Sequence, residues 1–498
     1  MEAPWWRSAA FYQIYPRSFA VGSPGRPHGD LAGIEAHLDH VSWLGADAVW
    51  LSPFYPSPMD DLGYDVSDHC DVDPGFGDLA AFDRLLEACH GRGLKLLVDF
   101  VANHTSDRHP WFQAARSSRD DPHRDWYVWR DGTPDTPPNN WRAAFVDGPA
   151  WTWDEATGQW YLHLFLPSQP DLDWSTPAVR RAMHDVVRFW LDRGVDGFRI
   201  DVAHCLGKEP GLPDDPAEIA AIPHSALNDV PQTHDRLREL RRLVDTYPCD
   251  RLLLGEVYLL DTDRVATYYG HGDELHLSFN FPPMFAPWSA RHWRARIDAT
   301  RRAIDDRGAW PTWVLSNHDN PRHRTRYGGS EARARAAPFI LLGLRGSPVL
   351  YAGEEIGLED AAVPPERAVD PGGRDGCRAP IPWTGEPGHG WFSPDEWLPW
   401  PPDAAHRNVA AQRADEGSIL HLYRRLLAAR RTSTALQLGE LAWLDSPDHV
   451  LAWRRWDAAG ERIVAVNMGD RPAAVPVDGR VVVASDGAGE GEPFPGTL

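Results

Sequence analysis

Segments with strand-like and helix-like patterns alternate along most of this 498-residue chain. Short apolar runs predict strands, and stretches with one apolar stripe predict the helices between them. The predicted strands are Phe11–Pro16, Asp47–Pro53, Lys95–Val101, Val195–Val202, Arg251–Val257, Leu275–Asn280, Trp313–Asn317 and Pro348–Tyr351. The predicted helices are Asp30–Leu44, Leu79–His90, Pro177–Arg193, His234–Tyr247, Ala332–Leu344 and Leu420–Ala429. Eight strands, most of them followed by a helix, predict an α/β fold, the (β/α)8 TIM barrel.

Two regions depart from this alternation and divide the chain. Residues 105–169 are rich in Trp, Pro and Asp with little helical period, which predicts a loop-rich domain inserted after the third strand. The barrel then comprises residues 1–104 and 170–435. Residues 436–498 predict a small all-β domain with strands at Val450–Trp456, Arg462–Val466, Ala473–Val477 and Val481–Ala484. A doubly wound sheet is the competing arrangement, but the Gly-rich phosphate loop that usually follows its first strand is missing from the sequence.

The net charge of −22 disfavours nucleic acid or an anionic membrane surface as a partner, because both are polyanions. The five cysteines are scattered, odd in number and without metal-ligand spacing, so we expect reduced thiols in a cytoplasmic protein. The first twenty residues do not have the pattern of a signal peptide. No apolar run approaches the length of about 20 residues that spans a bilayer.

The apolar stretch Gly197–Asp201 carries two charged residues on one strand face. Side chains alternate along a strand, so Arg199 and Asp201 share a face opposite Phe198 and Ile200. Two charges on a buried strand are costly to desolvate, and a cation beside a carboxylate favours the ionised carboxylate. An ionised carboxylate suits a nucleophile, whereas an isolated Arg-x-Asp pattern is more often a structural ion pair.

Other predicted strands also end in polar residues. In barrels of this type, active sites lie at the carboxyl ends of the strands, so these residues are expected to meet at one rim. The rim residues are Tyr64 and Asp65, Asp99, Asn103 and His104, Arg199 and Asp201, Glu256, Asn317 to Asp319, and Glu354 with Glu355. A single polar residue at a strand end is weak evidence, but a cluster of carboxylates and histidines predicts an active site.

Four segments resemble motifs of glycoside hydrolase family thirteen, the α-amylase superfamily, and most closely its α-glucosidase and oligo-1,6-glucosidase branch. They are Asp99–His104, Gly197–Val202, Gly255–Tyr258 and Ser316–Asp319. Gln169–Trp174 and the segment Arg374 to Pro380 support the same branch. The resemblance extends from about Phe11 to the last predicted helix and is weaker in the C-terminal region.

The resemblance implies a retaining hydrolysis with three catalytic carboxylates. Asp201 would attack the anomeric carbon, and Glu256 would protonate the leaving oxygen and then deprotonate water. Retention requires these two carboxyls to lie about 5 Å apart, and Glu256 needs a raised pKa to keep its proton. Asp319 would bind sugar hydroxyls and stabilise the oxocarbenium-like transition state.

The resemblance also implies a set of residues around a terminal glucose. Asp65, His104, Arg199, His318 and Arg374 match the hydroxyl-binding residues of the family, and Tyr64, Phe145 and Phe165 match aromatic residues that pack on the sugar. A pairing of Asp65 with Arg374 would close the pocket on one side and limit cleavage to terminal glucose. Val202 resembles the residue associated with α-1,6 linkages, but the segment that follows it resembles enzymes of mixed preference, so the linkage stays open.

The expected ligand is a small sugar, bound without a metal or other cofactor. Residues 20–30 correspond to a calcium-binding loop of oligo-1,6-glucosidases, but Asp30 is their only anionic residue and Arg26 adds a positive charge, so we expect no calcium there. A monomer or small homo-oligomer is expected. Three alternatives are a transglucosylase or sucrose-acting enzyme, a noncatalytic binding subunit, and a metal-dependent hydrolase using His104, His318 and Asp319.

Overall fold

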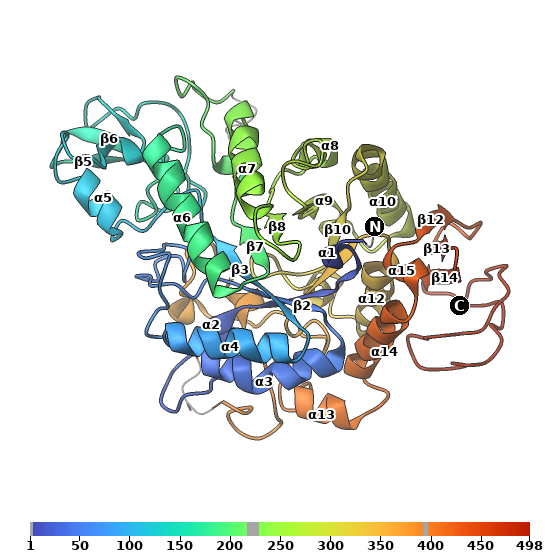
Figure 1. Ribbon diagram of the computed structural model, residues 1–498. Coiled ribbons are helices and arrows are strands. Elements are labelled where there is room, and N and C mark those ends of the chain that lie inside the picture. The colour runs from blue at the N-terminus through green and yellow to red at the C-terminus, as the bar shows by residue number, and fades with distance from the viewer. Residues whose placement is uncertain (1–2, 217–228, 392–396) are drawn as a thin grey trace.

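The computed structural model describes residues 3–216, 229–391 and 397–498, and its centre is an eight-stranded parallel sheet that curves into a barrel (Figure 1). The strand order is β10-β11-β1-β2-β3-β7-β8-β9. A hydrogen bond of 2.5 Å from Thr312 Oγ1 on β10 to the Ser278 carbonyl of β9 bridges the two ends of the sheet. The strands are β1 (Phe11–Ile14), β2 (Ala48–Leu51), β3 (Lys95–Phe100), β7 (Gly197–Ile200), β8 (Leu252–Gly255), β9 (Leu277–Ser278), β10 (Thr312–Val314) and β11 (Ser347–Tyr351). The predicted TIM barrel is confirmed.

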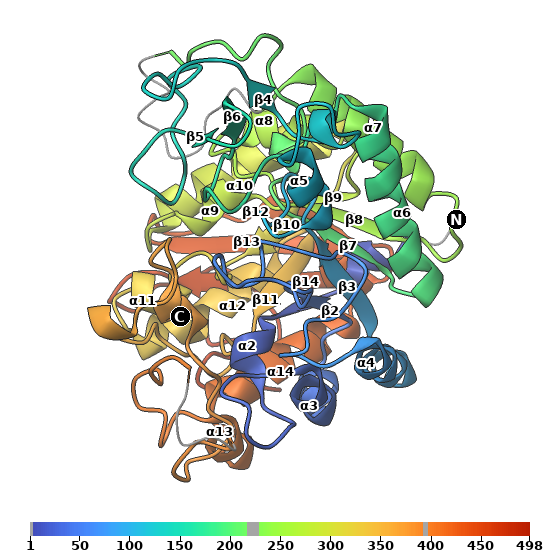
Figure 2. The same ribbon diagram turned by 90° about the vertical axis from the view of Figure 1, so that its left-hand side faces the viewer.

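Helices surround the strands, and Figure 2 shows α3, α4, α6 and α7 along the outside of one half of the barrel. The helix α3 begins after Asp30, whose side chain accepts a hydrogen bond from the Gly33 amide, and ends at Gly45 with a positive φ of 103°. The longer helices are α3 (Leu31–Leu44), α4 (Leu79–Gly91), α6 (Pro177–Arg193), α7 (Pro231–Val244), α10 (Ala290–Ile304), α12 (Glu331–Gly343) and α14 (Ile419–Arg431). The shorter ones are α1 (Trp5–Ser8), α2 (Pro16–Phe19), α8 (Thr262–Thr267), α9 (Phe281–Met284), α11 (His323–Arg326), α13 (Val409–Ala414) and α15 (Thr434–Gln437).

The segment between β3 and α6 forms a separate small layer. It contains α5 (Pro110–Ala115) and an antiparallel sheet of order β4-β6-β5, with strands β4 (Trp129–Arg130), β5 (Trp151–Asp154) and β6 (Gln159–Leu162). Its apolar core includes Trp141, Trp151, Trp160 and Phe165, and this core extends to Val202 and Cys205 of the loop after β7. The inserted segment therefore packs directly on the turn that follows Asp201.

The C-terminal region is a three-stranded antiparallel sheet, on the opposite side of the barrel from the inserted segment (Figure 1). Its strands are β12 (Glu440–Trp443), β13 (Val450–Asp457) and β14 (Gly460–Asn467). The two strands predicted at 473–477 and 481–484 are wrong, since only isolated bridges from Ala474 to Thr497 and from Arg480 to Pro493 form there. Pro476 cannot donate a backbone hydrogen bond, which explains why the first of these segments does not extend into a ladder.

Boundaries differ from the sequence predictions mainly where strands end. The strand predicted at 195–202 stops at Ile200, because the chain turns sharply at Val202. The helix predicted at 234–247 begins three residues earlier, with Pro231 in its first turn. Within the described ranges, none of the helices has both the length and the apolar character that crossing a bilayer requires.

An apolar layer fills the lower part of the barrel interior. It contains Phe11, Ala48, Trp50, Leu97, Leu252, Leu254, Leu277, Val314 and Val349, contributed by seven of the strands. The intervening residues of the same strands pack outward in a second core shared with the helices. This alternation is the period of two that a barrel strand with two buried faces requires.

Candidate active site

A polar layer lies directly above the apolar one, toward the carboxyl ends of the strands. Gln13 on β1, Asp99 on β3, Arg199 on β7 and Glu256 after β8 each lie two residues beyond an inner apolar or glycine position. Because side chains two residues apart point to the same side, all four point into the barrel. Asp99 and Arg199 are direct partners in the parallel register of β3 with β7.

Arg199 contacts three carboxylates at the base of the site. Its Nη1 lies 2.7 Å from Asp201 Oδ1 and 2.9 Å from Asp99 Oδ1, and its Nη2 lies 2.7 Å from Glu256 Oε2. The guanidinium is 1% exposed, so it is shielded from solvent. One buried cation therefore fixes the positions of three carboxyl groups, which come from β3, from the end of its own strand β7 and from the end of β8.

Burial raises the pKa of Glu256, and the negative charge of Asp319 adds to the effect against the pull of Arg199. Burial also raises the pKa of Asp201 well above its usual range, again against Arg199, with Glu256 and Asp99 contributing. The expectation that Arg199 keeps the pKa of Asp201 low is thus wrong, because burial outweighs the neighbouring cation. The charge of Glu256 disfavours ionisation of Asp201, and the two carboxyls titrate as a pair that retains one proton more readily than an isolated carboxyl does.

A strained turn connects the two carboxylates. Val202 has φ 34° and ψ 50°, in the left-handed region that β-branched residues rarely occupy. In this conformation its amide donates a hydrogen bond of 3.0 Å to Glu256 Oε2, and the next amide, of Ala203, donates to the Glu256 carbonyl. The interpretation of Val202 as an ordinary strand residue is wrong, because the residue belongs to the turn that orients Glu256.

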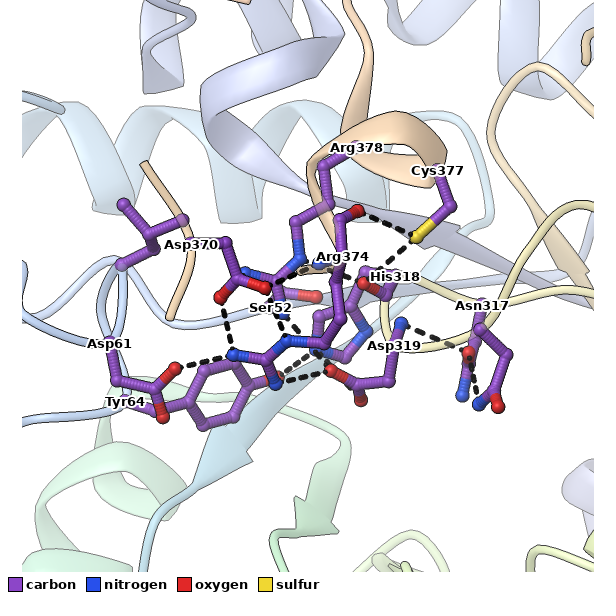
Figure 3. Close-up of polar contacts among 12 residues, drawn as sticks. Ser52, Asp61, Tyr64, Asn317, His318, Asp319, Asp370, Arg374, Cys377 and Arg378 are labelled. Carbon is purple, nitrogen blue, oxygen red and sulfur yellow. Dashed lines mark hydrogen bonds and ion pairs between the residues drawn. The ribbon is translucent and has the colours of Figure 1, made fainter. Parts of the chain in front are cut away.

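Arg374 lies among three carboxylates on the other side of the site (Figure 3). Its Nη2 lies 2.6 Å from both Asp61 Oδ1 and Asp370 Oδ1, and its Nη1 lies 3.0 Å from Asp319 Oδ1. Arg378 adds a second contact of 3.0 Å to Asp319. Although burial by itself raises the pKa of Asp319, the interactions with His318, Arg374, Arg378 and Arg199 together outweigh burial and lower the pKa. Asp319 is therefore held ionised.

A pocket opens above these groups and brings most of the predicted residues together. Tyr64, His104, Phe145, Phe165, Asp201, Val202, Glu256, Asp319 and Arg374 line it, and Asp61, Tyr258 and Asn320 complete the wall. The Phe145 and Phe165 rings lie 5.5 Å apart, and the Arg374 guanidinium lies 4.4 Å from the centre of the Phe145 ring. Arg199 and His318 lie beneath the wall, where they support the lining residues.

Asp65 does not lie where the sequence prediction put it. Its carboxylate accepts hydrogen bonds from the Ser57 hydroxyl and from the amides of Asp60 and Asp61, and it is fully buried. Burial raises the pKa of Asp65 to about 6. The predicted pairing of Asp65 with Arg374 is wrong, and the partner is Asp61. Asp65 instead shapes the loop that presents Asp61 to the pocket.

Gln169 is a second residue whose role the sequence did not reveal. Its Nε2 donates to Asp61 Oδ2 at 2.9 Å and lies 3.2 Å from His104 Nε2. Burial lowers the pKa of His104, so its imidazole is held neutral and carries one donor and one acceptor. Gln169 thus links the inserted segment to two pocket residues.

An ammonium group binds the chain just before and just after the inserted segment to the loop that follows β7. Lys208 Nζ lies 2.7 Å from Asn103 Oδ1 and 3.0 Å from Asp171 Oδ2, and it donates to the Cys205 carbonyl. In the loop of residues 20–30, Asp30 accepts bonds from the amides of Gly22, Ser23 and Gly33. The side-chain oxygens of Asn103 and Asp171 thus bind the Lys208 ammonium, and those of Asp30 accept backbone hydrogen bonds. A dication at either site would need these same oxygens as ligands.

Comparisons with known proteins agree with one another. A family model described as "Alpha amylase, catalytic domain" matches residues 13–439. A probable alpha-glucosidase of Rhizobium meliloti is 40% identical, with 95% of this chain and 91% of that protein covered. An oligo-1,6-glucosidase of Parageobacillus thermoglucosidasius is 36% identical, covering 95% and 92%. The crystal structure of an alpha-glucosyl transfer enzyme, XgtA, superposes with a TM-score of 0.92 at 41% identity, covering 97% and 96%.

Proposed function

The chain belongs to the α-amylase family of glycoside hydrolases, and on that premise we propose that it is a retaining, exo-acting α-glucosidase. It would release terminal nonreducing glucose from short α-linked oligosaccharides or α-glucosides. The observation that carries this proposal is the shared contact of Asp201 and Glu256 with Arg199 at the base of the pocket. This arrangement provides two carboxyls of different role beside one bound sugar ring.

In the first step, Asp201 Oδ attacks the anomeric carbon and the glycosidic C–O bond breaks. The proton of Glu256 passes to the leaving oxygen, and a β-linked glucosyl ester of Asp201 remains. In the second step, Glu256 takes a proton from water, whose oxygen attacks the same carbon and displaces Asp201. Two inversions at one carbon release α-glucose and return both carboxyls to their starting state.

The proton shared by the coupled pair belongs on Glu256 in the reactive form. Both carboxyls contact the Arg199 guanidinium at 2.7 Å, and Glu256 receives additional repulsion from Asp319, which favours its protonated form. Asp319, ionised between two arginines, faces the pocket where positive charge develops on the ring oxygen and anomeric carbon. A fixed negative charge there stabilises the transition state more than the neutral substrate.

The charged wall of the pocket supports exo action. Arg374 joins Asp61 and Asp319, so three charged side chains from separate loops surround the position of the terminal sugar. Their polar atoms fit sugar hydroxyls, and a chain continuing past that sugar would have to displace the ion pair of Asp61 with Arg374. His104 and the two phenylalanines provide the remaining contacts with the same ring.

A second candidate function is transfer of glucose to a sugar acceptor, as in a transglucosylase or a sucrose-acting enzyme. Its support is the resemblance to the alpha-glucosyl transfer enzyme. Both functions share the first step and differ in whether water or an acceptor hydroxyl enters beside Glu256. Product analysis at high maltose and high sucrose distinguishes them, and rates on maltose and isomaltose give the linkage preference that Val202 is proposed to influence.

The direct test is to trap the glucosyl ester. Rapid quenching of the Glu256→Gln variant with an activated α-glucoside is expected to add the mass of one glucosyl residue, which is glucose less water, to the peptide that contains Asp201. The Asp201→Asn variant should keep its fold, lose nearly all hydrolysis of p-nitrophenyl α-glucoside, and show no adduct. Release of β-glucose as the first product, or full activity of Asp201→Asn, would contradict the proposal.

We further propose that the chain divides into a barrel of residues 1–104 and 170–435, an inserted domain of 105–169, and a C-terminal domain of 436–498. We also propose a cytoplasmic protein, in keeping with five cysteines that are all free thiols. It would act as a monomer or small homo-oligomer on small sugars, without nucleic acid and without a calcium ion in the loop of residues 20–30. The engaged Asp30 carboxylate supports the last point.

A further inference from the structure

His318 is a buried imidazole whose protonation state the surrounding groups determine. Burial lowers its pKa well below the usual value against the opposing charge of Asp319, and the positive charges of Arg378, Arg199 and Arg374 act in the same direction as burial. The ring is therefore neutral and carries a single proton, on either Nδ1 or Nε2. Which nitrogen carries it decides whether the ring donates or accepts on the side of the pocket.

Two carboxylates constrain the Nε2 side of the ring. Asp319 Oδ2 lies 3.3 Å from His318 Nε2, and an ionised carboxylate only accepts hydrogen bonds. The Tyr64 hydroxyl lies 2.6 Å from the same nitrogen and donates its own proton to Asp99 Oδ2 at 3.2 Å. The tyrosine oxygen is then left to accept, so both neighbours require a proton on Nε2.

Gln13 occupies the opposite side. Its Nε2 lies 2.7 Å from His318 Nδ1 and 3.2 Å from Ser52 Oγ, so both amide hydrogens have acceptors (Figure 3 shows Ser52 and His318). The side chain is fully buried on β1, and in the described part of the chain its Oε1 has no hydrogen-bond partner. Leaving a buried oxygen without a partner costs free energy. The Gln13 amide keeps this orientation because its Nε2–H must donate to His318 Nδ1.

We propose that Gln13 is a positioning residue of the active site that holds His318 in the Nε2–H tautomer. The polar chain runs in one direction, from Gln13 through His318 and Tyr64 to Asp99. The Nε2–H faces Asp319 and Tyr64, which both line the pocket, so His318 acts on the site through these two residues. The catalytic part of this inference rests on the proposed glucosidase function.

The opposite orientation of the Gln13 amide would favour the other tautomer of His318. If Gln13 presented Oε1 to the ring, Nδ1 would carry the proton and Nε2 would carry a lone pair. That lone pair would face the Asp319 carboxylate at 3.3 Å, where two acceptors repel each other. The orientation of the Gln13 amide on β1 thus determines which ring nitrogen of His318, in the loop after β10, carries the proton.

The test uses ¹⁵N-histidine-labelled, ligand-free protein, so its first readout does not depend on activity. Correlation spectra identify the protonated ring nitrogen, and the spectrum of His318→Asn assigns the His318 signals. The wild-type protein should show the proton on Nε2. Gln13→Glu, which offers only an acceptor to Nδ1 at neutral pH, should move it to Nδ1 and lower kcat/KM for p-nitrophenyl α-glucoside at least about tenfold.

Two more variants separate orientation from packing. Gln13→Met keeps the volume without the donor, so signals of both tautomers should appear, and it replaces Gln13→Glu if that variant does not fold. Ser52→Ala removes the other partner of the amide and should leave the Nε2–H signals in place. A wild-type proton on Nδ1, or a folded Gln13→Glu with the Nε2–H signals and kcat/KM within twofold of wild type, would overturn the proposal.

Discussion

Arg374 pairs with Asp61, whose Oδ1 lies 2.6 Å from its Nη2, and not with Asp65 four residues later. The two aspartates differ in what surrounds them. Asp61 lines the pocket, while the Asp65 carboxylate accepts three hydrogen bonds from its own loop. The Asp61 carboxylate is therefore available to a ligand, whereas the Asp65 carboxylate is occupied by hydrogen bonds within its own loop.

Substitution should separate these two roles. Asp61→Asn removes one charge opposite Arg374, and we expect kcat/KM on maltose to fall about 100-fold while stability falls less than in Asp65→Ala, because Arg374 keeps Asp319 and Asp370 as partners. Asp65→Ala leaves buried donors unpaired, each costing about 1–3 kcal/mol, and should be detected by urea unfolding. A stable Asp65→Ala that has lost sugar binding would reverse the assignment.

The pH dependence of the first step should be bell-shaped. Asp201 must lose its proton, so kcat/KM falls as the pH drops through the lower apparent pKa of the pair. Glu256 must keep its proton, so kcat/KM falls again as the pH rises through the upper one. Because burial raises the pKa of both carboxyls, both limbs should lie at higher pH than those of free carboxyls.

A variant identifies the alkaline limb. Glu256→Gln cannot lose a proton, so its residual kcat/KM on p-nitrophenyl α-glucoside should show the acid limb alone. This substrate suits the measurement because its leaving group departs with little protonation. An alkaline limb that persists unchanged in Glu256→Gln would assign the upper pKa to a different group.

Replacing Arg374 should raise the pKa of Asp319. That pKa is lowered by the positive charges around the carboxylate, among them Arg374 at 3.0 Å. A carboxylate whose pKa is lowered keeps its charge down to lower pH, so in Arg374→Met the charge is lost earlier as the pH falls. We expect kcat/KM to fall at least about 100-fold, with the acid limb displaced to higher pH. Arg374→Lys, which keeps the charge, is the control, and it should show a smaller displacement.

Removing the Lys208 ammonium should loosen the inserted segment. Lys208→Met leaves Asp171, which is fully buried, without its cation, and losing one partner of a buried ion pair costs about 3–5 kcal/mol. Urea unfolding measures the loss, and proteolysis should cut first within residues 105–169.

Treatment with EDTA should leave the activity of the wild-type enzyme unchanged. Inhibition by EDTA that calcium reverses would show that a dication contributes as well.

The barrel and its catalytic carboxylates could be predicted from the sequence because both depend on local patterns. Apolar runs of fixed period give the strands, and polar residues directly after those runs must meet at the carboxyl ends. Asp201, Glu256 and Asp319 follow from that rule. The spacing Asp61-x-x-Tyr64 was also visible, but without the loop conformation Asp65, adjacent to Tyr64, was an equally good candidate.

What the sequence missed depends on backbone conformation and on contacts between distant segments. The left-handed turn at Val202 has no sequence signal, since valine favours strands. Gln169 and Lys208 bind partners in other parts of the chain, so no periodicity marks them. Gln13 looks like a break in an apolar strand until the barrel brings His318 beside it.

The apolar core shared by the inserted segment and the loop after β7 has a consequence for protein engineering. A chimera that exchanges residues 105–169 with those of a relative would leave Val202 and Cys205 facing a foreign surface. The exchange would have to include the stretch from 202 to 212, which supplies Val202, Cys205 and Leu212 to this core. Substrate specificity should therefore be exchanged between relatives only when residues 105–169 and 202–212 are exchanged together.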